Sequence, residues 1–317
     1  MKIFVTGSAG FIGCHTAKAL LERGDEVVGI DNYNDYYSPQ LKKDRSALLK
    51  EFENYQDYSG DICNKELLEK IFKTEEFDKI CHLAAQAGVR YSLKHPFVYQ
   101  HSNLDGFVNI IEYSKRFNVK NFIYASSSSV YGGTKNIPFK EDEKLDKPLS
   151  LYGATKIADE AIAYAYNHLS SLHCTGLRFF TVYGPWGRPD MAIFKFADLM
   201  VKGKPIEVYN YGKMQRNFTY IDDIVQGVLA SIDKDFDFEI FNLGNSKTVE
   251  LEYFIECIEK ELGIKAEKNL LPLQPGDLVV TYADISKAKR MLNFNPTTNV
   301  EEGIKKFIEW YREYHDI

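Results

Sequence analysis

Tyr152 and Lys156 are the residues whose types and spacing could most directly do acid–base chemistry. Residues four apart lie on one face of a helix, where an ammonium favours ionisation of a phenol near neutral pH, as a proton acceptor requires. A run of hydroxyls, Ser126 to Ser129, lies upstream at the end of a predicted strand, and one could hydrogen-bond a substrate oxygen. A solvated helix face and a self-satisfied polar loop are the alternatives. The helix follows the strand whose end carries the serines, and this order favours the catalytic interpretation.

A glycine-rich turn near the N-terminus supplies a second element. Gly7, Gly10 and Gly13 follow a strand predicted over 2–5 and open a helix predicted over 11–23. The first two glycines let the backbone approach a pyrophosphate, whose charge the helix N-terminus stabilises, and the third allows close packing of helix on strand. The spacing is one residue wider than the common dinucleotide fingerprint. A turn that only closes a helix is the alternative.

Asp31 ends the next predicted strand, 26–30. A carboxylate at this point accepts a hydrogen bond from the 2′-hydroxyl of an adenosine ribose and repels a 2′-phosphate, which favours NAD over NADP. A dinucleotide site combined with the Tyr152–Lys156 pair predicts removal of a hydride and a proton from an alcohol. The sequence therefore predicts oxidoreductase chemistry at a hydroxyl.

Composition excludes several other classes. The net charge of -6, from 39 basic and 45 acidic residues, argues against nucleic acid as a partner. The five cysteines are scattered without a Cys-x-x-Cys pair, which indicates buried thiols in a reducing cytoplasm and no metal site. A strand at the N-terminus leaves no room for a signal peptide, and no apolar run reaches membrane-spanning length. We expect a cytoplasmic protein with no membrane partner.

Strands alternate with helices up to about residue 180, which predicts an α/β fold with a Rossmann-like, doubly wound parallel sheet. Strands are expected at 78–83, 122–125 and 175–180, and helices at 96–118 and 151–169. The alternation then stops: strands are expected at 206–209, 217–221 and 239–243, and helices at 222–231, 249–262, 285–292 and 300–314. We predict an NAD-binding domain over 1–180 and a smaller C-terminal α/β substrate-binding domain over 181–317, with a fuzzy boundary and segments that can interleave.

Over nearly its whole length the chain resembles the extended short-chain dehydrogenase/reductase enzymes that modify nucleotide-diphosphate sugars. The matching stretches are Thr6 to Gly13, Asp61-Ile62, His82 to Gln86, Ser126 to Gly132, Tyr152 to Lys156 and Arg178 to Gly184. Within that family it most resembles the UDP-glucuronate 4-epimerases. The stretches that carry this finer resemblance are Asp31 to Tyr37, Ala84 to Arg90, Thr181 to Met191 and Gly212 to Asp223.

The resemblance implies a tightly held NAD that is reduced and reoxidised within one turnover on a UDP-sugar. Tyr152 would take the C4 hydroxyl proton with help from Ser127, and Lys156 would also bond the nicotinamide ribose. Arg216 would pair with the diphosphate, and Asp277 would hold the uridine ribose. The further expected cofactor contacts are Phe11, Ile12, Asn32, Asp61, Ile62, Leu83, Ala84, Ala85, Gln86 and Tyr183. The further expected substrate contacts are Arg90, Ser128, Ser129, Thr181 and Arg188.

Neighbouring members of that family are the main alternatives. Sugar 4,6-dehydratases carry an acid–base Asp-Glu pair, and UDP-glucuronate decarboxylases a Glu, where this chain has Ser128 and Ser129, so elimination lacks its proton donor. UDP-glucose 4-epimerases carry Asn in place of Thr181 and lack the segment around Arg188, which would suit a sugar carboxylate. A loop arginine tied to a surface acid is the alternative for Arg188. A UDP-glucose or UDP-N-acetylhexosamine 4-epimerase is the runner-up. A non-catalytic NAD-sensing protein is the alternative from another class, although such proteins usually lose the Tyr or Lys.

The two long helices predicted over 96–118 and 151–169 could pair across a two-fold axis as a four-helix contact. The family resemblance implies this arrangement. We therefore expect a homodimer.

Overall fold

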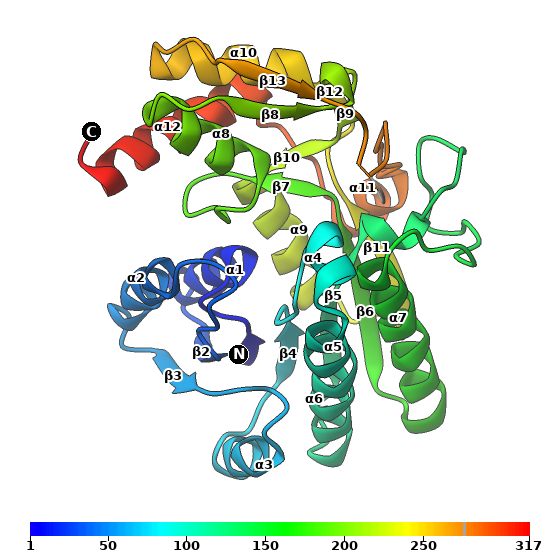
Figure 1. Ribbon diagram of the computed structural model, residues 1–317. Helices are drawn as coiled ribbons and strands as arrows, with labels where there is room; N and C mark the ends of the chain where they lie inside the picture. The colour runs from blue at the N-terminus through cyan, green and yellow to red at the C-terminus, as the bar shows by residue number, and fades with distance from the viewer. Residues whose placement is uncertain (275–276) are drawn as a thin grey trace.

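The computed structural model describes residues 1–274 and 277–317, and its centre is a seven-stranded sheet (Figure 1). All paired neighbours run parallel in the order β11-β6-β5-β4-β1-β2-β3. The strands are β1 (Lys2–Thr6), β2 (Glu26–Asp31), β3 (Tyr55–Ser59), β4 (Lys79–His82), β5 (Asn121–Ser127), β6 (His173–Phe179) and β11 (Phe238–Leu243). The chain starts in the middle and winds outward both ways, which confirms the predicted Rossmann-like sheet.

Helices cover both faces of this sheet, because successive apolar side chains of the central strands point to opposite faces and both faces must be buried. On β1, Ile3 and Val5 belong to one hydrophobic core and Phe4 to another on the opposite face. The first face is covered by α1 (Phe11–Glu22), α2 (Pro39–Lys50) and α9 (Ile221–Asp233). The second is covered by α3 (Lys65–Thr74), α6 (Gly106–Arg116) and α7 (Leu151–Ser170). Burial on both faces explains why the central strands are apolar nearly throughout.

The helix predicted over 96–118 is interrupted. It consists of α5 (Pro96–Tyr99), a π-helical turn η1 (Gln100–Asp105) and α6, and it is preceded by α4 (Val89–Lys94). Inside the π turn, Asn103 accepts a hydrogen bond from the Gln86 backbone N–H at 2.7 Å and donates to the Gln86 carbonyl at 3.0 Å and to Thr155 Oγ1 at 3.0 Å. The π turn thus ties the chain after β4 to the first turns of α7.

Two elements between β2 and α3 were not predicted. Pro39 sits in the first turn of α2, and β3 pairs with β2 at the edge of the sheet. The β3 sequence Tyr-Gln-Asp-Tyr-Ser has none of the aliphatic residues that mark a buried strand, because an edge strand needs little apolar surface.

A smaller group of elements lies above the carboxyl ends of the sheet in Figure 1. It contains three short strand pairs and four helices among the described residues: β7 (Thr181–Tyr183) with β10 (Phe218–Tyr220), β8 (Ile206–Tyr209) with β13 (Lys268–Leu271), β9 (Gln215–Arg216) with β12 (Val249–Glu250), and α8 (Ala192–Val201), α10 (Leu251–Leu262), α11 (Ser286–Leu292) and α12 (Val300–His315). Short 3-10 turns lie at η2 (Ser128–Tyr131) and η3 (Asn210–Gly212). Strand β11 and helix α9 follow residue 180 yet belong to the main sheet layer, so the division into domains at 180 stays a prediction with interleaved segments.

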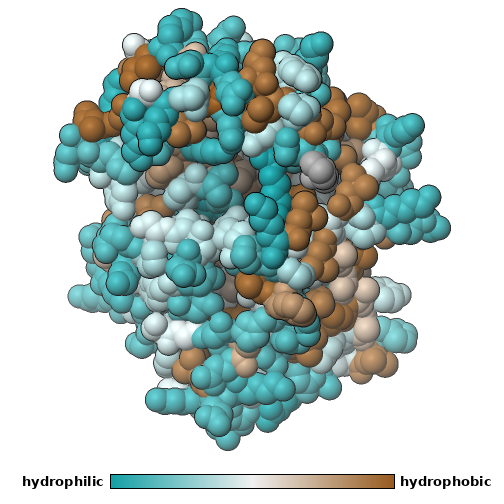
Figure 2. All heavy atoms as spheres, viewed as in Figure 1, coloured by the Kyte–Doolittle hydropathy of each residue, from teal (hydrophilic) through white to brown (hydrophobic). Residues whose placement is uncertain are grey.

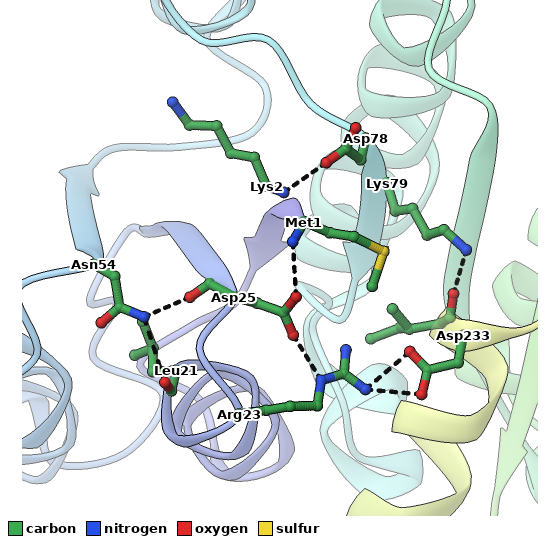
Figure 3. Close-up of polar contacts among 10 residues, drawn as sticks. Met1, Lys2, Leu21, Arg23, Asp25, Asn54, Asp78, Lys79 and Asp233 are labelled. Atoms are coloured by element: carbon green, nitrogen blue, oxygen red, sulfur yellow. Dashed lines mark hydrogen bonds and ion pairs between the residues drawn. The ribbon is translucent and has the colours of Figure 1, made fainter.

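The opposite edge, at the amino ends of the strands, is tied by a polar cluster (Figure 3). The Met1 ammonium bonds Asp25 at 2.9 Å, and Arg23 bonds Asp25 at 2.7 Å and Asp233 at 2.8 Å. These contacts join the end of α1 to the end of α9 and leave the carboxyl edge free for a site. In the described part of the chain, no helix combines the length and apolar character needed to cross a membrane.

Candidate active site

A cavity of about 820 Å³ lies at the carboxyl edge of the sheet, beneath the smaller group of elements. Ligands of open α/β sheets bind at this edge, near the point where the strand order reverses. All but one of the residues predicted for cofactor and substrate line it. They are Gly7, Gly10, Phe11, Ile12, Gly13, Asp31, Asn32, Asp61, Ile62, Leu83, Ala84, Ala85, Gln86, Arg90, Ser127, Ser128, Ser129, Tyr152, Lys156, Thr181, Arg188, Arg216 and Asp277.

The glycine turn after β1 has no room for side chains. Gly7 has φ +71°, and a Cβ there would lie 2.9 Å from the backbone of Ala84. A Cβ on Gly13 would lie 2.0 Å from the Gly7 carbonyl oxygen, and one on Gly10 2.9 Å from the same oxygen. Bare backbone therefore faces the cavity at the start of α1, which fits the close approach of a pyrophosphate to a helix N-terminus.

Asp31, at the end of β2, is held by backbone donors. Its carboxylate accepts hydrogen bonds from the N–H groups of Tyr33 at 2.9 Å and Ala9 at 3.2 Å. Burial raises the pKa of Asp31, while these donors and the nearby Lys42 ammonium oppose the rise. Asn32 donates to Asp61 at 2.9 Å, so the predicted adenosine-side residues form one connected group.

The Asp61 carboxylate also lies near two other groups that can bind metals. Ligand atoms of Asp61, Cys63 and His101 all lie within 4.8 Å of one another, and Cys63 and His101 were not among the predicted site residues. Burial followed by the Asp61 charge raises the pKa of the Cys63 thiol to about 12, so the thiol is protonated at neutral pH.

Helix α7 presents the predicted acid–base pair. Ser150 caps the helix by accepting from the Gly153 N–H at 3.0 Å, and a Cβ on Gly153 would lie 2.6 Å from the Ser129 carbonyl oxygen. The serine run therefore packs directly against the first turn of α7. Both Tyr152 and Lys156 reach the cavity, with Lys156 only 2% exposed and its Nζ donating to the Ala125 carbonyl at 2.9 Å.

Hydroxyls line the cavity wall beside this pair. Ser127 is the last residue of β5, and its Oγ accepts a hydrogen bond from the Ser129 N–H at 3.1 Å. Ser128 and Ser129 begin a 3-10 turn, and Thr181, which begins β7, lines the same cavity. This wall offers neutral donors and acceptors and no carboxylic acid at the two positions where elimination would need one.

Arg188 does not stand free in the cavity. It donates to Asp190 from Nε at 3.0 Å and from Nη2 at 2.5 Å, and the Tyr36 hydroxyl donates to the same carboxylate at 3.0 Å. Burial works against the Arg188 charge, but the Asp190 carboxylate and nearby phenols outweigh it and raise its pKa. Among the described residues, Nη1 of Arg188 makes no hydrogen bond, so part of the guanidinium can still meet a ligand.

A second cationic group lies beneath the smaller elements. Arg90 bonds Asp277 at 2.5 Å and stacks over the Tyr209 ring at 4.1 Å. Arg216 donates to the carbonyls of Gln215 and Val279. Burial lowers the pKa of its guanidinium to about 10; the Asp277 charge opposes this fall and the Arg90 charge adds to it. A doubly charged anion between these arginines would stabilise their charges. The residues 275–276 that precede Asp277 lie outside the described part of the chain.

Tyr183 is the predicted site residue that the structure places elsewhere. Its side chain is 2% exposed and packs edge-on against Phe218, Tyr220 and Phe254. The ring is held in the core under β7 and is absent from the described cavity wall, so a cofactor contact of Tyr183 stays a prediction.

Several cavity residues were missed by sequence reasoning. They come mainly from the tyrosine-rich loop after β2 and from α2, α8 and β8: Asn34, Tyr36, Tyr37, Lys42, Lys195, Glu207 and Tyr209. The clustering of tyrosines after Asp31 was the available signal, since three aromatic side chains in one polar loop need a surface to pack against.

Comparison with known proteins gives the family. Residues 3–244 match the family model described as NAD dependent epimerase/dehydratase family. UDP-glucuronate 4-epimerase 4 from Arabidopsis thaliana is 48% identical over 333 residues, which cover 99% of this chain and 76% of that protein.

Solved structures match over the whole chain. The UDP-glucuronic acid 4-epimerase from Bacillus cereus, in complex with UDP-glucuronic acid and NAD, has a TM-score of 0.93 at 35% identity, covering 99% of this chain and 100% of its own. The UDP-glucose 4-epimerase from Thermotoga maritima, with UDP-glucose, has a TM-score of 0.90 at 30% identity, with coverage of 99% and 100%. The chain is thus similar to epimerases that act on different UDP-sugars.

Proposed function

Since the chain belongs to the NAD dependent epimerase/dehydratase family, we propose that it inverts C4 of UDP-glucuronate to give UDP-galacturonate through a 4-keto sugar. The protein is an isomerase, and its cofactor is NAD. The proposal concerns the sugar and the residues that act on it.

The residues around the glycine turn fit NAD. Bare backbone at Gly7, Gly10 and Gly13 suits the pyrophosphate, and Asp31 suits an unphosphorylated adenosine ribose. When bound, NAD supplies a hydride acceptor for C4 of the sugar and later returns the hydride. Lys156 would bond the nicotinamide ribose from the floor of the cavity.

Tyr152 is the proposed base at the reacting hydroxyl. It takes the C4 hydroxyl proton during oxidation and returns a proton during reduction, so one group serves both half-reactions. Ser127 orients the same oxygen, and Lys156 favours the ionised phenol. Arg216 and Arg90 hold the diphosphate while the keto sugar turns over and presents its other face.

The observation that carries the choice of sugar is that Arg188 and the hydroxyl residues Ser128, Ser129 and Thr181 line the same cavity. In the 4-keto sugar, a C6 carboxylate lies β to a ketone and would readily leave as carbon dioxide. Ser128, Ser129 and Thr181 can hold that carboxylate by neutral hydrogen bonds, and the free Nη1 of Arg188 can keep it charged. At the two positions where dehydratases and decarboxylases carry an acid, this chain has Ser128 and Ser129.

UDP-glucose is a second candidate because Asp190 already pairs with Arg188. The Arg188–Asp190 pair has no net charge, so the cavity around it can accept an uncharged sugar as well as a charged one. A UDP-N-acetylhexosamine needs the same neutral surroundings. A decarboxylase or a non-catalytic NAD sensor is supported less, because the acid is absent and Tyr152 and Lys156 are both present.

The test is kcat/KM for UDP-glucuronate and UDP-glucose, measured on the same preparation. We expect UDP-glucuronate to be preferred. A preference for UDP-glucose would replace the proposal with its runner-up, and no turnover of either sugar with NAD bound would favour a sensor.

We propose in addition that the protein is a homodimer through α5, α6 and α7. Exposed apolar side chains lie along this surface, including Phe97 (78% exposed) and Leu169 (82% exposed). Figure 2 shows hydrophobic residues gathered over the region where Figure 1 draws α4 and α5. Such a patch is unfavourable in water and suits a second copy. Light scattering on eluted protein should give twice the chain mass, and Phe97→Glu should halve it.

A further inference from the structure

Behind the acid–base pair lies a carboxylate that the proposed mechanism does not use. Asp159 is 0% exposed, sits three residues after Lys156 on α7, and accepts a hydrogen bond from Lys156 Nζ at 3.0 Å. It is not part of the described cavity wall. Lys156 is itself only 2% exposed, so both charges of this pair are removed from water.

Burying this ion pair costs free energy of folding, which indicates that the pair serves a function other than stability. A buried ion pair pays a desolvation penalty that its attraction often only balances. Asp159 Oδ1 has no hydrogen-bond partner among the described residues, and the nearby hydroxyl of Tyr124 on β5 has none either. A side chain chosen for packing would avoid both penalties.

We propose that Asp159 is a positioning residue for the Tyr152–Lys156 pair: its carboxylate fixes the Lys156 ammonium and weakens the field that this ammonium exerts on the Tyr152 phenol. The inference rests on the proposed role of Tyr152 as base. It adds a residue that adjusts the base strength of Tyr152.

The Lys156 ammonium has three N–H groups, and two of them are used inside the protein, which leaves the third for a ligand in the cavity. One N–H points to the Ala125 carbonyl on β5 and one to Asp159, so the ammonium cannot swing away from the first turns of α7. The opposite charge of Asp159, 3.0 Å from Nζ, weakens the field of this ammonium.

The charge state of Asp159 changes in the physiological range. Burial raises its pKa to about 6, Lys156 opposes the rise, and Glu160 adds to it. The other charged or titratable groups that face the pair are His82 on β4, which burial keeps neutral, Tyr124 on β5, and Glu160, which is bound in turn by Arg178 on β6. As pH falls through about 6, Asp159 takes a proton and no longer opposes the charge of Lys156.

The experiment is a direct titration of Tyr152 in the NAD-bound protein without sugar. Subtracting the tyrosinate absorbance of Tyr152→Phe from that of the parent isolates this phenol, and the same subtraction is made in the Asp159→Asn background. We expect the midpoint to fall by about one pH unit or more in Asp159→Asn, because the ammonium is no longer opposed. The fall of kcat on the acid side of its pH profile should shift to lower pH by a similar amount, while KM for the UDP-sugar stays unchanged.

Asp235→Asn is the matched control, since it removes one negative charge from an exposed pair with His173. It should leave the midpoint in place. If Asp159→Asn does not fold, Asp159→Ser removes the same charge and leaves room for water beside Lys156. An unchanged or raised midpoint in the folded variant would overturn the inference.

The titration needs no substrate, so its outcome is independent of which sugar the enzyme prefers. If UDP-glucuronate is not turned over but the midpoint falls as expected, the proposed substrate fails and this inference stands. If UDP-glucuronate is epimerised but the midpoint does not move, the inference alone fails.

Discussion

Replacing Arg188 by Ala gives the sharpest information on the sugar. The Arg188 side chain is 23% exposed and bidentate to Asp190, whose side chain is 31% exposed, so the variant removes a partly buried cation and leaves Asp190 with the Tyr36 hydroxyl as its donor. Truncating one member of a buried pair costs about 2–5 kcal/mol, or about a 30- to 4,000-fold loss in kcat/KM for a substrate that uses it, and the partial exposure of this pair favours the lower end. We expect UDP-glucuronate turnover to fall within this range.

The remaining Asp190 makes the loss specific. Its charge would now repel a C6 carboxylate but not the C6 hydroxymethyl group of UDP-glucose, whose kcat/KM should change little. The double variant Arg188→Ala/Asp190→Asn removes the repulsion and should recover part of the loss. The assay is kcat/KM for both sugars in the parent and both variants, with products checked for a UDP-pentose. Equal losses for both sugars, or no recovery in the double variant, would refute the assignment of Arg188 to the carboxylate.

Four further outcomes are expected. Tyr152→Phe should keep NAD bound and lose turnover by several orders of magnitude, measured as single-turnover rate; near-normal epimerisation would remove Tyr152 as the base. NADP should neither co-purify nor restore activity to stripped protein, because Asp31 repels a 2′-phosphate, and equal rescue by both cofactors would contradict this. Gly7→Ala should lower the NAD content of purified protein, since its Cβ would lie 2.9 Å from the Ala84 backbone; a full NAD complement would show that the turn can shift. Burial lowers the pKa of His15 to about 4 and of His82 to about 3, so between about pH 6 and 4 the unfolded chain binds protons that the folded chain does not. The free energy of unfolding should therefore fall by up to about 1.4 kcal/mol per pH unit for each His as pH drops from about 6 toward 4. A free energy of unfolding that stays constant over this pH range would contradict the expectation.

The parts of the fold that were predicted from sequence are those with strong local signals. Apolar runs ended by glycine or Asp marked β1 and β2, and the glycine turn and Tyr152–Lys156 spacing marked the site. Strand β8 was placed at its observed bounds, because Ile206 and Val208 alternate with polar residues. Strand β11 was also found, but its pairing with β6 is a long-range contact that no local pattern encodes.

The failures have physical causes of the same kind. Strand β3 is polar because it is an edge, and the π turn at Asn103 depends on bonds to Gln86 and Thr155 that lie far along the chain. Tyr183 was expected to contact the cofactor, and its ring packs against the core rings of Phe218 and Phe254, which a motif alone does not reveal. A pairing of Arg188 with an acid was weighed as the alternative to a ligand contact, but the Tyr36 bond to Asp190 was not foreseen, since the two residues are 154 positions apart in the chain.

The central claim is tested most directly by proton NMR of UDP-glucuronate incubated with the NAD-bound protein in deuterated water. The account predicts new signals from UDP-galacturonate without added cofactor, and no deuterium at C4, because the hydride removed from C4 returns to C4. Loss of carbon dioxide to a UDP-pentose, deuterium at C4, or unchanged UDP-glucuronate in a preparation that epimerises UDP-glucose would contradict it.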